Sequence, residues 1–238
     1  MSIELSNVEI HIRGKLQPLD FKNINLRIEP KQRVALLCPD RVGLSSLVGV
    51  MAGSRRPDIG LVMRECRLSW PIPDTSFCHK HLNFIANARF IARLYEIDQK
   101  TFIPQVIKTA GVEDLAEERL DRCPKAVLSR FAFALGVSVP FDIYLFTSTT
   151  VGEKSEQEKY QQMVTELGRS HGLIVAATKA KAAELHCDEA FLIDGRTTHY
   201  YDDMEAAADH MARLAKRSRP GDDDDEVAEE EEQVFDDF

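Results

Sequence analysis

The chain has 238 residues, of which 44% are hydrophobic, so it is long enough and apolar enough to fold around a sizeable core. Residues 1–5 lack the basic and apolar regions of a signal peptide, and no apolar run reaches the roughly 18 residues that a spanning helix needs. The five cysteines form no Cys-x-x-Cys pair, which argues against a disulfide framework or a zinc site and for a reducing cytoplasm.

The net charge of −9 belongs to one end of the chain. Residues 222–238 hold eleven of the 39 acidic residues, which leaves 28 acidic against 30 basic residues elsewhere. We therefore expect a folded domain over 1–217 and an acidic tail over 218–238. The tail is typical of a disordered, solubilising segment. The alternative is a segment that docks on a basic protein surface or on the body itself, anchored by Phe235 and Phe238. Nucleic acid would repel it, so no nucleic-acid partner is expected.

The stretch over 34–53 predicts a strand, a tight loop and a helix. Residues 34–37 are an apolar strand, the helix runs over 47–53, and Gly53 stands where a helix ends. This is the arrangement of a phosphate-binding loop, in which backbone N–H groups and the helix dipole attract phosphate. The alternative is an ordinary strand, loop and helix that happens to carry a glycine and two serines.

The residues of this loop depart from the phosphate-binding pattern of Gly, four residues, Gly, Lys and then Ser or Thr. Cys38 takes the first glycine position, Gly43 the second and Leu44 that of the lysine, and Ser45 and Ser46 follow. Leu44 forfeits a charge-assisted hydrogen bond worth about 1.5–3 kcal/mol. We expect no nucleotide or only weakly bound Mg-ATP. Cys38 is either a plain small side chain or a redox-sensitive thiol whose pKa the helix N-terminus lowers.

The remaining chain alternates strands and helices, which predicts an α/β fold with a mostly parallel sheet covered on both faces. Strands over 2–12 and 25–28, joined by a turn at Gly14-Lys15, predict a small antiparallel sheet before the loop. The elements expected after the loop are strands over 61–63 and 67–70, helices over 80–95, 99–110, 113–120 and 126–135, a strand over 141–146, a helix over 156–171 ended by Gly172, a strand over 173–177, a helix over 180–186, a hairpin of 190–193 and 197–201 with a type I′ turn, and a helix over 204–216.

Several short motifs follow the loop in a fixed order. They are Arg56-Pro57-Asp58, Ser69-Trp70-Pro71, the segment 87–95, the segment 130–135, the segment 141–145, Cys187-Asp188 with Asp194-Gly195, and Tyr201-Asp202-Asp203. Over about residues 2–215 this order resembles the ATP-binding subunits of ABC transporters, most of all those that export bacterial capsular polysaccharide. The resemblance implies a P-loop NTPase-like ABC nucleotide-binding domain with an N-terminal antiparallel sheet and a helical insert over about 72–120. It also implies ATP hydrolysis as the family activity.

The resemblance also places the functional positions of the family, and this chain has lost most of them. Thr147 and Ser148 stand where an aspartate and a glutamate would handle Mg²⁺ and water, and neither hydroxyl is a base or carries charge near neutral pH. Only Gly43, Ser45 and Ser46 survive. The other degenerate positions are His79 near the γ-phosphate-sensing glutamine, Lys125 at the signature Ser-Gly, and Thr178 at the switch histidine.

The resemblance further implies a homodimer or heterodimer and a membrane permease as partners. Leu44 and Lys125 would compromise both nucleotide sites of a heterodimer, because each site combines the phosphate loop of one subunit with the signature of the other. We therefore expect a pseudo-ATPase without catalytic residues or a metal site, which acts as a structural or regulatory component of capsule export. It would be cytoplasmic, free or held peripherally on the inner face of the plasma membrane. The alternatives are an impaired ATPase that still binds nucleotide and a protein-binding module no longer tied to transport.

Overall fold

The computed structural model describes residues 2–12, 19–194 and 197–217. The predicted turn at Gly14-Lys15, the turn of the hairpin at 195–196 and the acidic tail lie outside these residues. Within the described ranges, no helix is both long enough and apolar enough to cross a membrane.

Strands and helices alternate along most of the chain, as the sequence predicts. The elements are β1 (Ile3–Ile12), β2 (Leu19–Ile28), β3 (Arg33–Leu37), α1 (Arg41–Ala52), β4 (Ile59–Arg64), α2 (Phe84–Leu94), α3 (Gln99–Ala110), the short 3₁₀ helices η1 (Glu113–Leu115) and η2 (Leu120–Arg122), α4 (Lys125–Ser138), β5 (Ile143–Phe146), α5 (Gln157–Leu167), β6 (Gly172–Ala177), the 3₁₀ helix η3 (Ala180–Ala182), β7 (Glu189–Ile193), β8 (Thr198–Tyr201) and α6 (Met204–Arg217).

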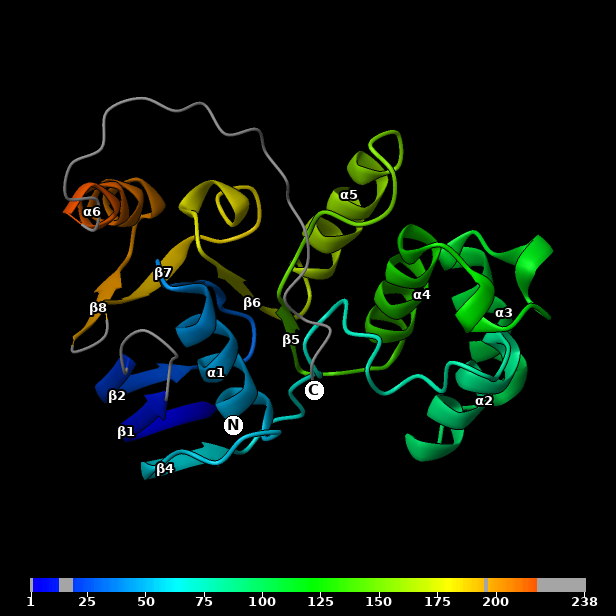
Figure 1. Ribbon diagram of the computed structural model, residues 1–238, viewed down its shortest axis with the longest axis horizontal. Coiled ribbons are helices and arrows are strands. Elements are labelled where there is room, and N and C mark those ends of the chain that lie inside the picture. The colour runs from blue at the N-terminus through cyan, green and yellow to red at the C-terminus, as the bar shows by residue number, and fades with distance from the viewer. Residues whose placement is uncertain (1, 13–18, 195–196, 218–238) are drawn as a thin grey trace.

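Two sheets organise these elements (Figure 1). The first has the order β2-β1-β4 and is antiparallel throughout, which confirms the predicted N-terminal sheet. The second has the order β5-β6-β3-β7-β8, in which only β8 runs antiparallel, as the last arm of the predicted hairpin. The connections place β3 at the centre of the parallel sheet, so the loop that follows β3 lies in the middle of its carboxyl edge.

Helix α1 lies between the two sheets (Figure 1). Its buried side chains, among them Leu47, Val50 and Met51, share one core with β1, β2 and one face of the parallel sheet. The opposite face of that sheet forms a second core with α2, α3, α4, α5 and α6. Every residue of β6 is buried, as expected of a parallel strand covered on both faces.

The largest difference from the predicted elements is the start of α1. The helix begins at Arg41, six residues before the predicted Leu47, because the Asp40 carboxylate accepts a hydrogen bond from the Gly43 N–H and caps the helix. The predicted tight loop is therefore reduced to residues 38–40. The end of the helix agrees with the prediction, since Gly53 has a φ of 86° and its N–H donates to the Gly49 carbonyl.

Four other predicted elements are wrong. Residues 113–120 and 180–186 form only the 3₁₀ helices η1, η2 and η3, none of which has a side-chain cap. Residues 67–70 make a single bridge, Leu68 with Ile143, instead of a strand. Gly172 begins β6 and does not end the preceding helix, which stops at Leu167. A Cβ on Gly172 would lie 3.0 Å from the side chain of Ile143, so packing between strands accounts for this glycine.

Candidate functional site

The carboxyl edge of the parallel sheet is the candidate site, because ligands of open α/β sheets bind beyond the carboxyl ends of the strands. Strands β5, β6 and β3 are adjacent and parallel, with Phe146 paired to Val175 and Leu37 paired to Ala177. The loops that begin at Cys38, Thr147 and Thr178 therefore leave the sheet along one edge. The Cys38 N–H donates to the Ala177 carbonyl at 3.2 Å, which ties two of these loops together.

The N-terminus of α1 is closed by the chain itself. The Asp40 Oδ1 atom lies 2.5 Å from the Gly43 backbone nitrogen, and the Leu44 N–H donates to the Asp40 carbonyl at 2.9 Å. These two N–H groups belong to the residues that a phosphate-binding loop would aim at its ligand. The Asp40 carboxylate also places an acidic side chain where a phosphate would need positive potential.

Leu44 and Gly43 both face the protein interior. The Leu44 side chain is 5% exposed and belongs to the core between α1 and the two sheets. A Cβ on Gly43 would lie 2.1 Å from the Cζ atom of Phe21, a β2 side chain that is 1% exposed. Gly43 is thus required by the close approach of an aromatic ring, and this requirement exists whether or not a phosphate binds.

The other loop residues have roles within the fold as well. Ser46 is buried, and its hydroxyl accepts a hydrogen bond from the Arg55 guanidinium at 2.9 Å. Cys38 is buried, and burial raises the pKa of its thiol to about 12; the thiol donates a hydrogen bond to the Asp40 carbonyl. The thiol is therefore protonated near neutral pH, which favours a plain small side chain over a redox-sensitive one.

The two hydroxyl residues after β5 bond to backbone groups. The Thr147 hydroxyl donates to the Ile72 carbonyl at 3.2 Å, and the Ser148 hydroxyl donates to the Thr150 carbonyl at 3.0 Å. Both residues are half-buried at the end of the strand, where the family's carboxylates would stand. Thr178, also half-buried, directly follows β6 on the same edge.

His79 and Lys125 belong to the helical part of the chain. The His79 N–H donates to the side-chain oxygen of Asn87 on α2 at 2.8 Å, and its ring lies 5.8 Å from that of His81. Lys125 is exposed and is the first residue of α4. Among the described residues, no group of three or more His, Cys, Asp or Glu side chains is placed to hold a metal ion.

The residues at the carboxyl edge do not fit magnesium triphosphate. The lysine position is a buried leucine, a carboxylate caps the helix, and two neutral hydroxyls already bond to the backbone. Of the surviving loop positions, Ser45 alone is half-exposed. Sequence reasoning did not identify Asp40, Phe21 or Arg55 as residues that shape this edge. The capping preference of aspartate directly before a helix is the signal by which Asp40 could have been found.

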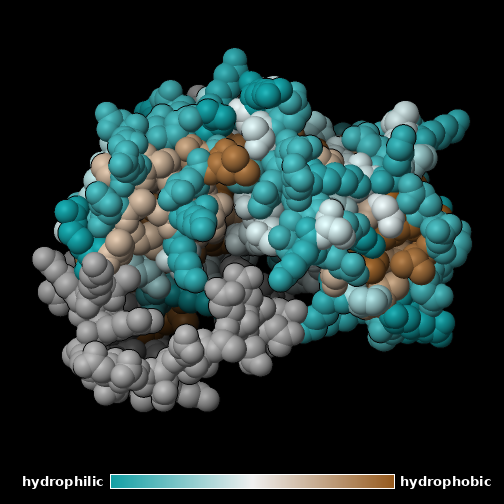
Figure 2. Space-filling view, turned by 90° about the horizontal axis from the view of Figure 1, so that it is seen from above, coloured by the Kyte–Doolittle hydropathy of each residue, from teal (hydrophilic) through white to brown (hydrophobic). Residues whose placement is uncertain are grey.

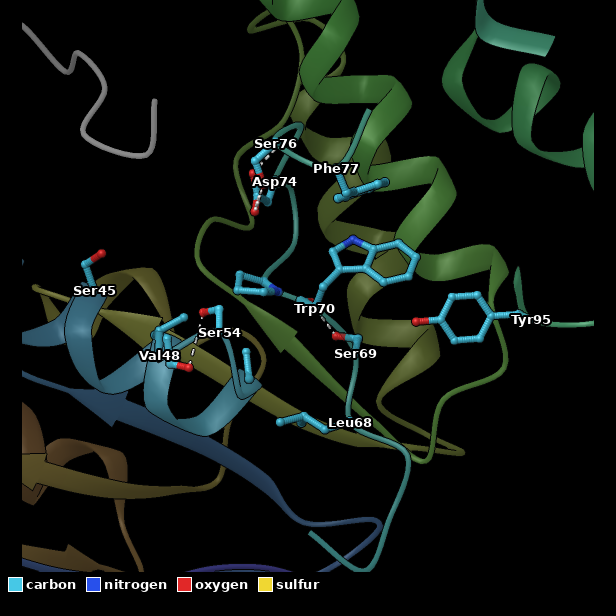
Figure 3. A pocket seen from close by; sticks show the side chains of 13 residues that line it. Ser45, Val48, Ser54, Leu68, Ser69, Trp70, Asp74, Ser76, Phe77 and Tyr95 are labelled. Atoms are coloured by element: carbon cyan, nitrogen blue, oxygen red, sulfur yellow. Dashed lines mark hydrogen bonds between the residues drawn. The ribbon is translucent and has the colours of Figure 1, made fainter. Parts of the chain in front are cut away.

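Ser45 opens into a groove next to the edge, with a volume of about 340 Å³ (Figure 3). One wall is α1, from Ser45 to Ala52, and the other is the segment after β4 together with Tyr95. The Trp70 ring lies 4.7 Å from Phe77 and 5.8 Å from Tyr95, measured between centroids. The groove therefore contains an aromatic cluster, and its polar lining includes Asp74 and Ser76 at one end.

Solved structures with the same fold are ATP-binding cassettes. The dimeric cassette MJ0796, in a post-hydrolysis state bound to ADP and Pi, matches with a TM-score of 0.70 at 16% identity and covers 83% of this chain and 97% of its own. The ATP-binding subunit of another ABC transporter matches with a TM-score of 0.74 at 14% identity over 90% and 100%. The fold is thus that of an ABC ATPase nucleotide-binding domain, as predicted.

The sequence relatives narrow this class. They are the ATP-binding protein BexA of Haemophilus influenzae, 28% identical over 82% of this chain and 91% of BexA, the polysialic acid transport protein KpsT of Escherichia coli, 27% identical over 82% and 91%, and the capsule polysaccharide export protein CtrD of Neisseria meningitidis serogroup B, 24% identical over 81% and 89%. No model of a protein family matches the chain. The chain is a homologue of the ATP-binding proteins of capsule polysaccharide export, which confirms the predicted resemblance.

Proposed function

We propose that the chain is a catalytically inactive homologue of the ATP-binding subunit and serves as a structural or regulatory component of a capsular-polysaccharide exporter. The relatives supply the transport context. The observation that supports inactivity is the closed N-terminus of α1, where Asp40 caps the helix and Leu44 turns into the core. Without a lysine at the phosphates and a carboxylate after β5, several electrostatic contributions are missing, each worth roughly 10²–10³ in rate.

The proposed partner is a membrane permease that docks on the helical part of the chain. Helix α2 exposes Phe90 and Leu94, 55% and 61% accessible, on a solvent-facing side that also carries Arg89 and Arg93. The aromatic groove of Trp70 and Tyr95 adjoins this helix, because Tyr95 follows its last residue. An apolar segment of a permease would cover these side chains. On this proposal the chain is a peripheral membrane component, and its acidic tail is available to a basic protein surface.

The decisive experiment is a titration of the purified full chain with Mg-ATP, followed by thermal unfolding and by phosphate release. We expect no rise in Tm and no hydrolysis. A ligand at one hundred times its Kd would stabilise the fold by about 2.7 kcal/mol, so binding is easily seen. BexA, purified in the same way, is the positive control. A magnesium-dependent rise in Tm with slow turnover would instead show an impaired ATPase that retains nucleotide through Gly43, Ser45 and Ser46.

A second experiment tests the transport context by co-purification of the tagged full chain with membrane subunits from the cells that produce it. The variant Phe90→Asp is expected to lose the permease, and Leu185→Asp, which changes a similarly exposed apolar side chain outside α2, is expected to retain it. Failure of the unmodified chain to capture any membrane subunit would favour a protein-binding module that has left transport.

A further inference from the structure

Strand β4 is an open edge of the antiparallel sheet. It pairs with β1 on one side, and among the described residues no strand pairs with its other side. Figure 1 shows β4 at the border of the molecule, beyond β1. An unpaired edge presents backbone N–H and C=O groups to any strand that approaches it, and proteins normally protect such edges with charges, prolines or bulges.

The solvent face of this edge strand is apolar. Ile59, Leu61 and Met63 alternate along β4 and are 53%, 56% and 39% exposed. On the neighbouring strand their partners in register are the polar residues Glu9, Ser6 and Glu4. The apolar row is therefore confined to the outermost strand, where the fold itself offers it no apolar neighbour. Figure 2 shows another face, on which hydrophilic residues predominate and hydrophobic patches are small.

The inner face of β4 is already occupied. Val62 packs against the core shared with α1, and the Arg64 guanidinium donates to the Met51 and Val50 carbonyls at 2.7 and 2.5 Å. These bonds satisfy the last carbonyls of α1. Val62 and Arg64 thus hold the strand in place, and Ile59, Leu61 and Met63 face solvent.

The backbone direction can be worked out from the register. The Glu65 N–H donates to the Ser2 carbonyl, so residue 65 directs its backbone groups toward β1. Because this direction alternates along a strand, Met63 and Leu61 do the same. Val62 and Arg64 then direct their backbone N–H and C=O groups away from β1, toward an incoming strand.

We propose that β4 pairs with β4 of a second copy of this chain in antiparallel orientation, with Leu61 opposite Leu61 of the second copy. In that register Ile59 lies opposite Met63 of the second copy, so the exposed apolar side chains meet one another. Asp58 lies opposite Arg64 of the second copy, so strand ends of opposite charge are adjacent, whereas a parallel arrangement would place like charges side by side. Within each copy the Asp58 carboxylate already accepts from the His11 N–H, its own N–H donates to the Glu9 carbonyl, and Arg64 donates to α1, so these two charges act at longer range and form no new hydrogen bonds.

The resulting contact is isologous and closes on itself around a twofold axis. It joins two three-stranded sheets into one six-stranded sheet and covers the apolar row on both copies. It uses the edge of the antiparallel sheet and no residue of the carboxyl edge, so it is independent of whether nucleotide binds.

Cysteine cross-linking tests the register directly. Leu61 would form a non-hydrogen-bonded pair with its counterpart, in which Cα atoms lie about 4.5 Å apart, within the range that a disulfide bridges. Leu61→Cys is therefore expected to form a covalent dimer on mild oxidation, in excess of the unmodified chain with its five native cysteines. Leu185→Cys, which replaces an apolar side chain outside β4 that is 61% exposed, is the matched control and is expected to stay at the background level.

Sedimentation of the full chain tests the association itself. The unmodified chain is expected to show a concentration-dependent dimer, and Leu61→Lys is expected to weaken it by at least about tenfold, because two ammonium groups would face each other across the axis. Leu185→Lys should leave the dimer unchanged, and unchanged far-ultraviolet circular dichroism verifies folding. A chain that stays monomeric, or a dimer that Leu61→Lys does not weaken, would overturn the proposal.

Discussion

The two edges of the parallel sheet are built in the same way although only one lies where ligands bind. At the amino edge, the Arg33 guanidinium donates to both carboxylate oxygens of Asp188 at 2.7 and 2.6 Å. At the carboxyl edge, the Asp40 carboxylate accepts from Gly43 and the Thr147 hydroxyl donates to a backbone carbonyl. At both edges these polar groups are satisfied by the chain itself.

This similarity between the two edges suggests that the carboxyl edge has a structural role. An edge adapted to a ligand keeps polar groups available and accepts a cost in stability for it. Here the polar groups of both edges bond within the chain and stabilise the fold. Substitutions at the carboxyl edge should therefore behave as structural substitutions do. They should change the free energy of unfolding and leave the response to Mg-ATP as it is.

The largest expected effect on the free energy of unfolding is at Leu44, at the carboxyl edge. Leu44→Ala removes a nearly buried side chain from the core around α1 and should lower the free energy of unfolding by about 2–5 kcal/mol. Leu44→Met preserves most of the volume and should cost less than about 1.5 kcal/mol. Urea denaturation measures both. Equal stabilities for the Ala variant and the unmodified chain would mean that Leu44 is not packed as described.

Gly43→Ala should be the next most costly change. Its Cβ would lie 2.1 Å from the Phe21 ring, which is buried and has little room to move, so a loss of about 1–3 kcal/mol is expected. Gly49→Ala is the matched control in the same helix. Its Cβ would meet its nearest neighbour only at 3.3 Å, so helix propensity should offset the crowding. Adding Phe21→Leu to Gly43→Ala should recover part of the loss, as a double-mutant cycle would show.

The Asp40 cap provides a third test of whether the carboxyl edge has a structural role. Asp40→Ala should destabilise the chain by about 0.5–2 kcal/mol, and Asp40→Asn, which can still accept from Gly43, should retain most of the stability. Thermal unfolding of the three proteins measures this order. A contrary result would be an Asp40→Ala variant that is as stable as the unmodified chain and whose Tm rises on addition of Mg-ATP. That result would mean that the carboxyl edge can bind nucleotide once the Asp40 carboxylate is removed.

The smallest effect concerns His186, which is near the amino edge and hydrogen-bonds Thr165 through Nδ1 at 3.1 Å. Burial, and then the charge of Arg33, lower the pKa of His186 below its usual value. The unfolded chain therefore binds this proton first as the pH falls. The contribution of His186 to stability should be constant above about pH 6.5 and should decline below it, by at most about 1.4 kcal/mol per pH unit. Denaturant titrations at pH 7.5 and 5.5 should show a shallower decline for His186→Gln than for the unmodified chain.

The sequence alone predicted the small antiparallel sheet, the mostly parallel sheet and most of the longer helices, but not the start of α1. Continuous apolar runs such as 173–177 predict buried strands, and Gly53 and Gly111 mark two helix ends that the structure confirms. The positions in the family motif predicted that Leu44 replaces a lysine. They did not predict that Asp40 caps the helix, nor that Phe21, a residue of another sheet more than twenty positions away, packs against Gly43. Short helices such as 180–186 were overpredicted, since their ends carry no capping side chain.

The place of α1 between two sheets also has a consequence for synthesis of the chain. One side of α1 is covered by the parallel sheet, yet β6 begins at Gly172, about 120 residues after α1 ends at Ala52. At ordinary rates of translation this gap lasts roughly ten seconds. During that interval Leu47, Val50 and Met51 have no parallel sheet to pack against. Newly made chains should accordingly depend on chaperones most heavily between the emergence of the first helix and that of the sixth strand.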